Sequence, residues 1–380
     1  MTNGASGLVS SFDPAFALRI NPLRSDDRIS VATEKIRDSD VSDLVEKGLS
    51  LSPIDARFYS LKGITAEKAG DRKTASDFYR YSLDLLPTER QALSRQFVFD
   101  IEQERYASAT KKLEVLGRRW PDRWGDLEPA LPILLSDPES YDLIMRRFIA
   151  YPPLASLLLR SLTKSAQTLP FAYRLTVDWH DRGIADLNGV INLVTNSFLR
   201  EYKYTDAYLL FQLTRPENSR SGYVYNDAFA MPFSGNAFDW KVRNQAGVSF
   251  NRIADNGNGA SALSMRFLDT PIQFRNVTQL VRLIPGPYEA TISYEGRDLI
   301  MPKPIRFAIR CLPSTTMSMS VPLQAGTYER SESHAFRVPV ENCVLQELYL
   351  YNDKLPLSWR NRYRGTLVLK SIKIRRRSGA

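Results

Sequence analysis

The 380-residue chain has no run of about 18 apolar residues, the length that a membrane-spanning helix needs. Its N-terminus, MTNGASGLVSSFDPAFALRINP, lacks the basic region and the continuous apolar region of a secretory signal. With 43% hydrophobic and 24% charged residues, the sequence as written is typical of soluble folded protein. We expect a periplasmic or envelope-associated location if an N-terminal anchor is missing, and a cytoplasmic one if the chain is complete as given.

Cysteine and histidine are scarce, with two of each: Cys311, Cys343, His180 and His334. The cysteines do not have the spacing of a zinc site, and two histidines supply few other ligands. We therefore predict no metal site and no cofactor. The two thiols are either buried and free or joined in one disulfide, which an oxidising compartment would favour. The sequence leaves both states open.

Catalytic motifs are missing as well. The sequence has no nucleophile elbow, no phosphate-binding loop and no HExxH motif, and neither histidine has a partner recognisable by its spacing. We predict a non-enzymatic protein without catalytic residues. A glycan-active enzyme stays open as an alternative, because glycosidase chemistry needs only two carboxylates, which distant strands can bring together.

The net charge of +9 is unevenly distributed along the chain. Residues 223–380 carry 21 Lys and Arg against 12 Asp and Glu, whereas residues 1–222 carry 30 of each sign. Lys354–Ala380 alone holds nine Lys or Arg and neither Asp nor Glu. Such a segment attracts an anionic polysaccharide, phospholipid or nucleic acid, or it is a solvated edge strand whose charges discourage edge pairing. A nucleic acid is the least favoured partner, because the rest of the chain is neutral overall.

What the first half does contain is a repeat. Pro53, Pro87 and Pro121 lie 34 residues apart, which is the tetratricopeptide period. Small residues let two helices cross closely and a proline ends each unit. The middle unit follows this pattern best, and in the next unit Phe97 stands where Gly belongs. We predict a tetratricopeptide-like α-solenoid over residues 25–222, after an N-terminal segment at 1–24. The middle unit's pattern residues are Tyr59, Gly63, Ala75, Tyr79 and Ser82.

The second half changes texture after a predicted linker at 223–237. Short alternating runs separated by Gly, Pro and Asn predict about ten strands over residues 238–380, which is typical of an antiparallel β-sandwich or jelly roll. The fold class is therefore multidomain, α and then β. The expected strands are Phe238–Arg243, Val248–Ile253, Ala262–Leu268, Phe274–Leu283, Tyr288–Tyr294, Ile305–Cys311, Met317–Val321, Ala335–Val338, Leu345–Tyr351 and Thr366–Ile374.

A family resemblance is carried by this half. The segments Phe238–Trp240, Ser261–Phe267 and Val281–Tyr288 are similar to galactose-binding-like jelly rolls of carbohydrate-binding modules, in which a strand ending in Pro-Gly precedes an aromatic residue. Phe307–Cys311, Phe336–Pro339 and Cys343–Gln346 look like the C-terminal half of bacterial tetratricopeptide proteins. The resemblance implies exopolysaccharide or cell-envelope functions, often with a membrane anchor upstream of the repeats.

One segment of the β-region joins aromatic and basic residues: Trp359, Arg360, Arg362, Tyr363 and Arg364. Sugars bind against aromatic faces with polar groups closing on their hydroxyls, and loops on a sandwich rim commonly form binding sites. We predict that this segment is a loop that contacts ligand. Trp240 is expected in the core, whereas Tyr349 and Tyr351 share one strand face that is either core or surface.

The leading hypothesis is a non-enzymatic scaffold in bacterial polysaccharide production or export. Its helical repeats would dock a protein partner on their concave face, and its sandwich would bind glycan, with an acidic polysaccharide favoured. A protein-assembly adaptor whose sandwich binds no sugar is the second hypothesis. Nucleic-acid binding through the basic C-terminus is the third, and it predicts a steep salt dependence.

Overall fold

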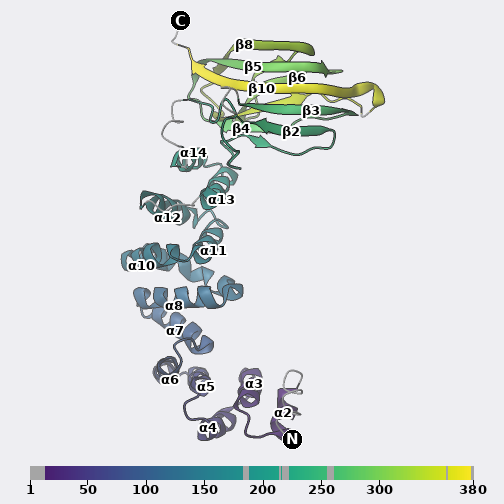
Figure 1. Ribbon diagram of the computed structural model, residues 1–380. Coiled ribbons are helices and arrows are strands. Elements are labelled where there is room, and N and C mark those ends of the chain that lie inside the picture. Colours follow the sequence, from purple (N-terminus) through teal and green to yellow (C-terminus); the bar gives the residue numbers. More distant parts are fainter. Residues whose placement is uncertain are drawn as a thin grey trace. The chain divides into compact units, whose positions relative to one another are not determined.

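The computed structural model shows helices followed by strands, as predicted (Figure 1). It describes residues 13–182, 188–213, 215, 222–254, 261–356 and 358–377, without the side chains of Asn188 and Trp359. The chain divides into two compact units, Met1–Ser161 and Leu162–Ala380. The boundary between the two units, at Ser161, lies within the region 25–222 that was expected to be helical. The predicted limits at 222 and 238 instead mark the change from helices to strands.

The first unit is built of short helices joined by tight turns. The 34-residue period is visible in their bounds: α5 (Ala56–Lys68) and α7 (Arg90–Glu102) begin and end 34 residues apart, as do α6 (Arg72–Leu85) and α8 (Tyr106–Arg119). The other helices of this region are α2 (Pro14–Ile20), α3 (Ser25–Lys35), α4 (Ser42–Leu51), η1 (Pro121–Asp126), η2 (Glu128–Ala130), α9 (Leu131–Ser136), α10 (Pro138–Ile149) and α11 (Pro152–Leu162).

Acidic residues fix where several of these helices begin. The side chain of Asp71 accepts a hydrogen bond from the Thr74 amide at 3.0 Å, and that of Asp137 accepts one from the Ser140 amide at 2.8 Å. These bonds satisfy amides that have no partner within the first turn of a helix. Pro121 and Pro138 stand at first helical positions, where the missing amide hydrogen costs nothing.

The degraded repeat units keep their packing by exchanging large and small residues. Gly63 packs so closely that an added Cβ would lie 2.4 Å from the Tyr79 ring. One period later, Phe97 replaces the glycine and the smaller Leu113 replaces the tyrosine, and both are buried. In both units one aromatic ring is buried at this pair of positions, from the second helix in one unit and from the first helix in the other. The repeat therefore persists in space where its residue pattern has faded.

The second unit begins with α12 (Leu169–Asp181), α13 (Asn188–Arg200) and α14 (Tyr204–Leu213). All three lie within the region 25–222 that the sequence predicts to be helical. Within the described ranges of the chain, we find no helix that is long and apolar enough to cross a membrane.

The sandwich consists of two five-stranded antiparallel sheets. Sheet A has the order β1-β4-β9-β6-β7, and sheet B has the order β2-β3-β10-β5-β8. Each predicted strand overlaps an observed one. The strands are β1 (Lys241–Val242), β2 (Val248–Ile253), β3 (Ala262–Pro271), β4 (Val277–Val281), β5 (Gly286–Ile300), β6 (Ile305–Pro313), β7 (Met317–Pro322), β8 (Gly326–Val338), β9 (Cys343–Asn352) and β10 (Arg362–Arg376).

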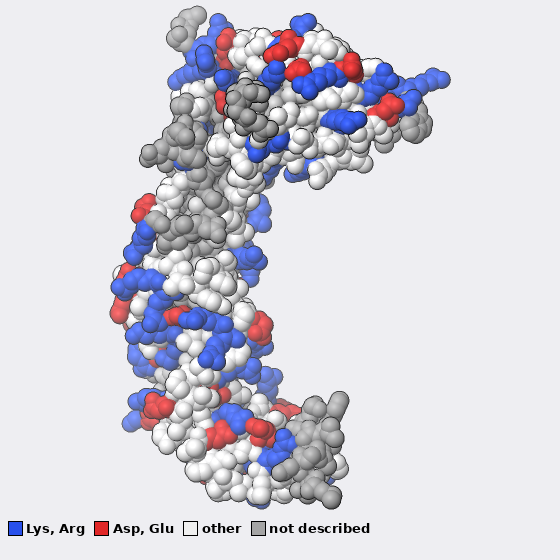
Figure 2. Space-filling model, viewed as in Figure 1, with Lys and Arg blue, Asp and Glu red and all other residues white. Residues whose placement is uncertain are grey.

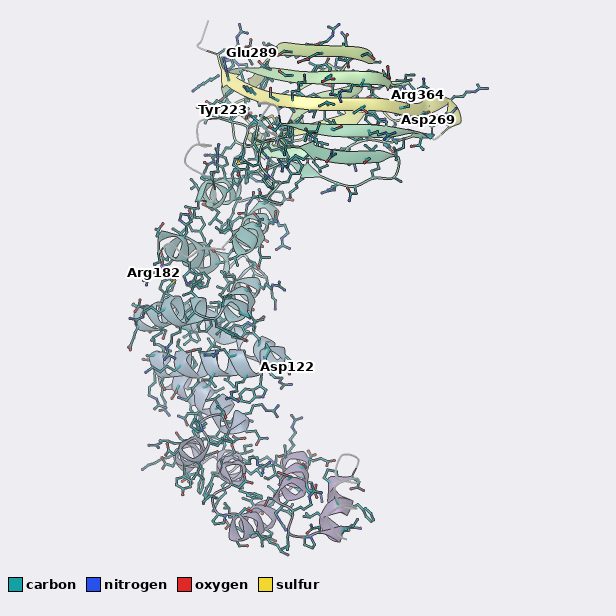
Figure 3. The ribbon with its side chains drawn as sticks, in the orientation of Figure 1. Asp122, Arg182, Tyr223, Asp269, Glu289 and Arg364 are labelled. Atoms are coloured by element: carbon teal, nitrogen blue, oxygen red, sulfur yellow. A yellow bond between two sulfur atoms is a disulfide. The ribbon has the colours of Figure 1, made fainter. Side chains whose placement is uncertain are left out.

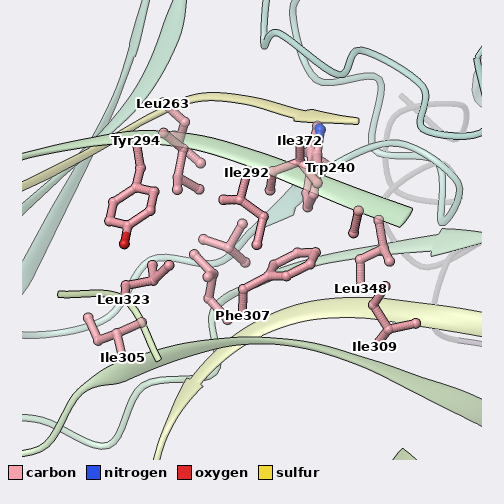
Figure 4. Close-up of a cluster of buried hydrophobic side chains, with 14 of the residues drawn as sticks. Trp240, Leu263, Ile292, Tyr294, Ile305, Phe307, Ile309, Leu323, Leu348 and Ile372 are labelled. Atoms are coloured by element: carbon pink, nitrogen blue, oxygen red, sulfur yellow. The ribbon is translucent and has the colours of Figure 1, made fainter. Parts of the chain in front are cut away.

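Alternating side chains from both sheets fill one core between them (Figure 4). Phe307 and Ile309 of β6 face Ile292 of β5 and Ile372 of β10 in this cluster. Trp240 is buried there too, as expected, and its indole nitrogen donates a hydrogen bond to the Asn226 carbonyl at 3.1 Å. Burial of the indole thus satisfies its only donor.

The segment expected to be a linker, 223–237, is packed rather than extended. Phe229 is fully buried in the sandwich core, and the Asn226 side chain holds the Met231 backbone through two hydrogen bonds of 2.9 Å. Phe238 stacks on Phe211 of α14 with ring centroids 5.3 Å apart. This packing explains why α12–α14 belong to one unit with the sandwich.

Candidate binding surfaces

The predicted contact segment lies at one end of the sandwich, where η4 (Trp359–Asn361) leads into β10. Arg360, Arg362 and Arg364 are exposed, and Arg362 pairs with Asp269 of β3 at 3.1 Å. Figure 3 shows Arg364 and Asp269 together at this end. The Trp359 side chain lies outside what the structure describes. The segment is thus a helical turn followed by a strand, whereas a loop was expected.

Tyr363 is fully buried, which corrects its assignment as a ligand contact. Its hydroxyl accepts a hydrogen bond from Asn352 Nδ2 at 2.9 Å and donates one to the Lys303 carbonyl at 3.0 Å. Burial raises the pKa of this phenol. A ring enclosed in the core cannot stack on a ligand in solvent, so Tyr363 anchors the strand that carries the exposed arginines.

Two aliphatic side chains flank Arg364 on the outer face of sheet B. The strand register pairs Arg364 with Leu268 of β3 on one side and with Ile300 of β5 on the other. Leu268 is 50% exposed and Ile300 46% exposed. We call Arg360, Arg362 and Arg364 with these two neighbours the arginine rim. Its members combine positive charge with exposed apolar area. A buried core would lack the charge, and an ordinary solvated strand face would lack the apolar area.

A second cluster lies on the outer face of sheet A, and we call it the tyrosine face. Leu348 and Leu350 of β9 point into the core, so Tyr349 and Tyr351 point outward. The two tyrosine rings lie 5.3 Å apart between centroids. The face consists of Tyr349, Tyr351, Glu347, Arg306, Arg310, Ser320 and Arg275, contributed by β9, β6, β7 and the turn before β4.

Arginines organise this face. The guanidinium groups of Arg275 and Arg310 lie 4.9 and 5.4 Å from the Tyr349 ring centroid, within cation–π distance. Arg310 Nε also donates to Glu347 at 2.6 Å. These contacts leave Tyr349 only 5% exposed, so Tyr351 presents the more accessible ring of the two.

The third arginine of the tyrosine face is tied to a hydroxyl pair. Arg306 Nε donates to Ser320 Oγ at 2.9 Å, and Ser320 Oγ lies 3.0 Å from the Tyr351 hydroxyl. Two of the three guanidinium groups, those of Arg275 and Arg310, contact Glu347, whereas that of Arg306 contacts Ser320. The result is a positively charged surface with a half-buried phenol and a serine hydroxyl at its centre.

The two cysteines are joined in the structure. Cys311 of β6 and Cys343 of β9 form a disulfide with Cα atoms 4.7 Å apart, and both are buried. Of the two states that the sequence allowed, the structure has the bonded one. The bond closes a 32-residue separation and joins neighbouring strands of sheet A.

His180 lies in α12 and His334 lies in β8, each beside one carboxylate. His180 Nδ1 lies 3.6 Å from Asp181, and His334 Nε2 lies 3.4 Å from Glu332. Among the residues that the structure describes, no group of three or more His, Cys, Asp or Glu could hold a metal ion. That the protein is not an enzyme stays a prediction.

The first unit contains a cavity of about 550 Å³ with a basic lining. Val98, 45% exposed, and Trp120 supply apolar surface beside it. Its one lining carboxylate, Asp126, pairs with Arg123 at 3.0 Å. The guanidinium groups of Arg37 and Arg90 form no hydrogen bond or ion pair with another described residue, although the Arg37 carbonyl accepts a hydrogen bond from Lys68 Nζ at 2.7 Å. The basic lining residues are Arg37, Lys68, Arg90, Arg95 and Arg123.

Comparisons with known proteins give partial likenesses. No family model and no curated protein matches the chain. A solved structure described as "CBM4 structure and function" is 10% identical and covers 40% of this chain and 99% of its own, with a TM-score of 0.32. TmCBM61 in complex with beta-1,4-galactotriose is 16% identical, covering 41% and 99%, with a TM-score of 0.29.

A third solved structure overlaps more of the chain. It comes from the functional characterization of Pseudomonas aeruginosa pilF, is 16% identical, and covers 52% of this chain and 79% of its own, with a TM-score of 0.26. None of these three likenesses carries an argument about what the chain binds.

Proposed function

We propose that this chain is a non-enzymatic binding protein whose sandwich binds an acidic glycan and whose helical unit docks a protein segment. A role in bacterial polysaccharide production or export is the setting that the family resemblance suggests. The observation that carries the glycan part is the tyrosine face, where three arginines surround a phenol pair on an open sheet surface.

The chemistry of this face suits a uronic acid or another anionic sugar. A carboxylate forms short, charge-assisted hydrogen bonds with guanidinium groups, which are stronger than neutral ones. The Tyr351 ring offers a surface for pyranose C–H groups, and Ser320 offers a hydroxyl partner at 3.0 Å from the phenol. Glu347 is the one carboxylate among the residues of this face and pairs with two of its three arginines, so an added anion would lower the electrostatic free energy of the face.

The arginine rim is a second place for glycan contact. Arg360, Arg362 and Arg364 remain candidates there together with Trp359, whereas Tyr363 does not. Arg362 already pairs with Asp269, so Arg360 and Arg364 are the residues that a sugar carboxylate would meet first. A long polysaccharide could engage both surfaces, whereas a short oligosaccharide would choose one.

The test is a titration of the full chain against acidic and neutral bacterial polysaccharides at two salt concentrations. We expect saturable binding of an acidic member and about a tenfold loss of affinity in Tyr351→Ala and in Arg310→Gln, since stacked rings and charged hydrogen bonds each contribute about 1–2 kcal/mol. Trp359→Ala tests the rim separately. Tyr202→Ala is the matched control, because Tyr202 is 73% exposed in the helical region.

Failure of every polysaccharide to bind would overturn the glycan proposal and leave the protein-assembly adaptor. Binding that is lost in Trp359→Ala but kept in Tyr351→Ala would move the site to the arginine rim. Product release from the polysaccharide would instead favour a glycan-active enzyme. Near-ultraviolet circular dichroism of each variant distinguishes a lost contact from a lost fold.

The cavity of the first unit supports the second part of the proposal. Its five basic residues and the apolar surface of Val98 and Trp120 complement an extended acidic segment with one or two apolar side chains. Arg37 and Arg90 are the groups with unused donors. Arg37→Gln with Arg90→Gln should weaken binding of such a peptide about tenfold, while Lys73→Gln with Lys111→Gln, on exposed helical positions, should not.

A further inference from the structure

Three exposed aliphatic side chains meet at the end of the sandwich that lies opposite the arginine rim. Gly286 of β5 pairs with Val338 of β8, and Ile284 and Val340 each lie two residues beyond this last pair. The Leu283 amide donates to Gln346 Oε1 at 2.7 Å, which brings the same turn beside the start of β9, where Val344 lies. We call Ile284, Val340 and Val344 the apolar tip.

The tip is unusually open to solvent. Val340 is 84% exposed, and Ile284 and Val344 are each 49% exposed. Single exposed aliphatic residues are common and need no explanation. Ile284 precedes β5, Val340 lies in the turn between β8 and β9, and Val344 lies in β9. Three exposed aliphatic residues at one end form a patch, and such patches mark surfaces that meet another phase or molecule. The core of the sandwich is already filled, so the tip does not serve its packing.

Basic side chains from the ends of β8 and β10, on the sheet B side, lie beside this tip. Arg377 donates its amide to the Pro287 carbonyl at 3.1 Å, and the Arg376 guanidinium lies beside Gly286. Five basic residues at this end have side chains that form no hydrogen bond or ion pair with another described residue. In Figure 2, blue side chains gather at this end, beside the last residues of β10. We call these five the basic collar: Arg337, Lys373, Arg375, Arg376 and Arg377.

Two carboxylates share this end of the sandwich. Glu289 lies opposite Arg375 in the strand register, and Figure 3 shows it at the end away from Arg364. Glu341 follows Val340 in the turn and is exposed. Asp227 is a third carboxylate nearby, since its carbonyl accepts a hydrogen bond from the Ile372 amide at 2.8 Å. Five positive charges against these three negative ones leave a local excess. This excess is the part of the basic C-terminus that neither the tyrosine face nor the arginine rim uses.

Exposed aliphatic residues beside several cations have the chemistry of a surface that inserts shallowly into a membrane. Apolar side chains enter the boundary between head groups and acyl chains, while Lys and Arg stay at the phosphate level and attract anionic lipids. A polysaccharide or nucleic acid would use the collar but has no acyl chains among which Val340 could insert. We propose that the apolar tip and basic collar form a peripheral binding site for an anionic lipid bilayer.

The experiment is co-sedimentation of the full chain with vesicles of phosphatidylcholine, alone or mixed equally with phosphatidylglycerol. We expect binding to the mixed vesicles only. Val340→Asp should reduce the partition coefficient at least about tenfold, because it removes insertion and adds repulsion. Arg375→Gln with Arg377→Gln should reduce it about fivefold per residue removed, the contribution of one cation near an anionic surface.

Matched controls come from the helical unit. Ile54→Asp replaces an aliphatic residue that is 80% exposed, close to Val340 at 84%, and Lys73→Gln with Lys111→Gln removes two exposed cations. Both controls should bind vesicles as the parent chain does. Absence of parent binding to the mixed vesicles, or equal losses in the controls, would overturn the proposal.

A third result would also overturn it: loss in the arginine variant with no change in Val340→Asp. That pattern indicates a purely electrostatic contact for a soluble polyanion. The lipid proposal does not rest on glycan binding, and the two are separable. Val340→Asp should keep the polysaccharide affinity of the parent, whereas Tyr351→Ala should keep its vesicle binding.

Discussion

At the residue scale, the contact between Gly63 and Tyr79 shows how little space separates α5 from α6. An added Cβ at Gly63 would lie 2.4 Å from Tyr79 Cε1, and both residues are buried. Alanine has the better helix propensity by about 1 kcal/mol, but overpacking costs about 1–3 kcal/mol. Because the tyrosine is enclosed, the cost should lie at the upper end of that range, and we predict that Gly63→Ala lowers the free energy of unfolding by about 2 kcal/mol in urea titrations.

The neighbouring repeat suggests the control for this substitution. There a larger residue in the first helix is matched by Leu113 in the second, so Tyr79→Leu should relieve the clash of Gly63→Ala. A double-mutant cycle should then give a favourable coupling free energy of about 1 kcal/mol. Gly189→Ala, at a position with no atom within 4 Å of an added Cβ, should not destabilise the chain. Additive effects of the first two substitutions would contradict the volume argument.

Asp100 is a buried carboxylate at the centre of a small ionic network. Burial by itself would raise the pKa of Asp100, but hydrogen bonds from Lys112, Arg105 and Ser108 outweigh burial and leave the pKa below its usual range. Lys112 Nζ lies 2.6 Å from its carboxylate. The native state therefore keeps this group ionised at pH values where the unfolded chain, with a pKa of about 3.9, takes up a proton.

The stability that Asp100 provides should therefore be complete above about pH 4 and fall as the pH drops below that value. Asp100→Asn should cost about 2 kcal/mol at neutral pH and flatten the acid loss, because its amide cannot titrate. Urea unfolding at a series of pH values measures both effects. Equal acid sensitivity in parent and variant would show that other carboxylates dominate this range.

At the element scale, sheet A is held across β6 and β9 by the Cys311–Cys343 disulfide as well as by backbone pairing. A bond that closes a loop of about 32 residues restricts the unfolded chain and contributes about 3–4 kcal/mol in the loop-entropy account. We predict that reduction lowers the free energy of unfolding of the sandwich by that amount. The double variant Cys311→Ser with Cys343→Ser should be insensitive to reductant, and an unreduced parent should differ from it.

Strands were more predictable from the sequence than the surfaces they carry. The alternation of apolar and polar residues that indicates a strand is local in the sequence. The strand predicted at Val248–Ile253 has the same bounds as β2. At Arg362–Arg364 the polar residues led us to expect a loop, and the structure has the start of β10 there. Its alternation of Arg, Tyr and Arg is a strand pattern, with the ring turned inward and the charges outward.

The tyrosine face could not have been assembled from local motifs. Arg275 and Glu347 are 72 positions apart in sequence and come within 3.4 Å only because β4 pairs with β9. The sequence showed that Tyr349 and Tyr351 share a face, but the choice between core and surface depended on which neighbours cover the opposite side. Strand order decides that choice, and strand order depends on contacts between distant segments.

At the scale of the whole molecule, the two compact units have separate cores. One set of buried residues around Phe58 and Val45 belongs to the first helices, and another around Phe307 and Ile292 belongs to the sandwich. Each unit has a distinct source of stability, with ionic and helix-packing contacts in the first and a disulfide in the second. Two units with separate cores can unfold independently when few contacts couple the free energy of unfolding of one to that of the other.

We therefore predict two calorimetric transitions whose midpoints move independently. Gly63→Ala and Asp100→Asn should lower one midpoint, whereas reductant and Cys311→Ser with Cys343→Ser should lower the other. A saturating acidic polysaccharide should raise only the transition that responds to reductant, because a ligand stabilises the unit that binds it. If both midpoints move together in every variant, the chain unfolds as one cooperative unit, and the docking and glycan surfaces are energetically coupled through it.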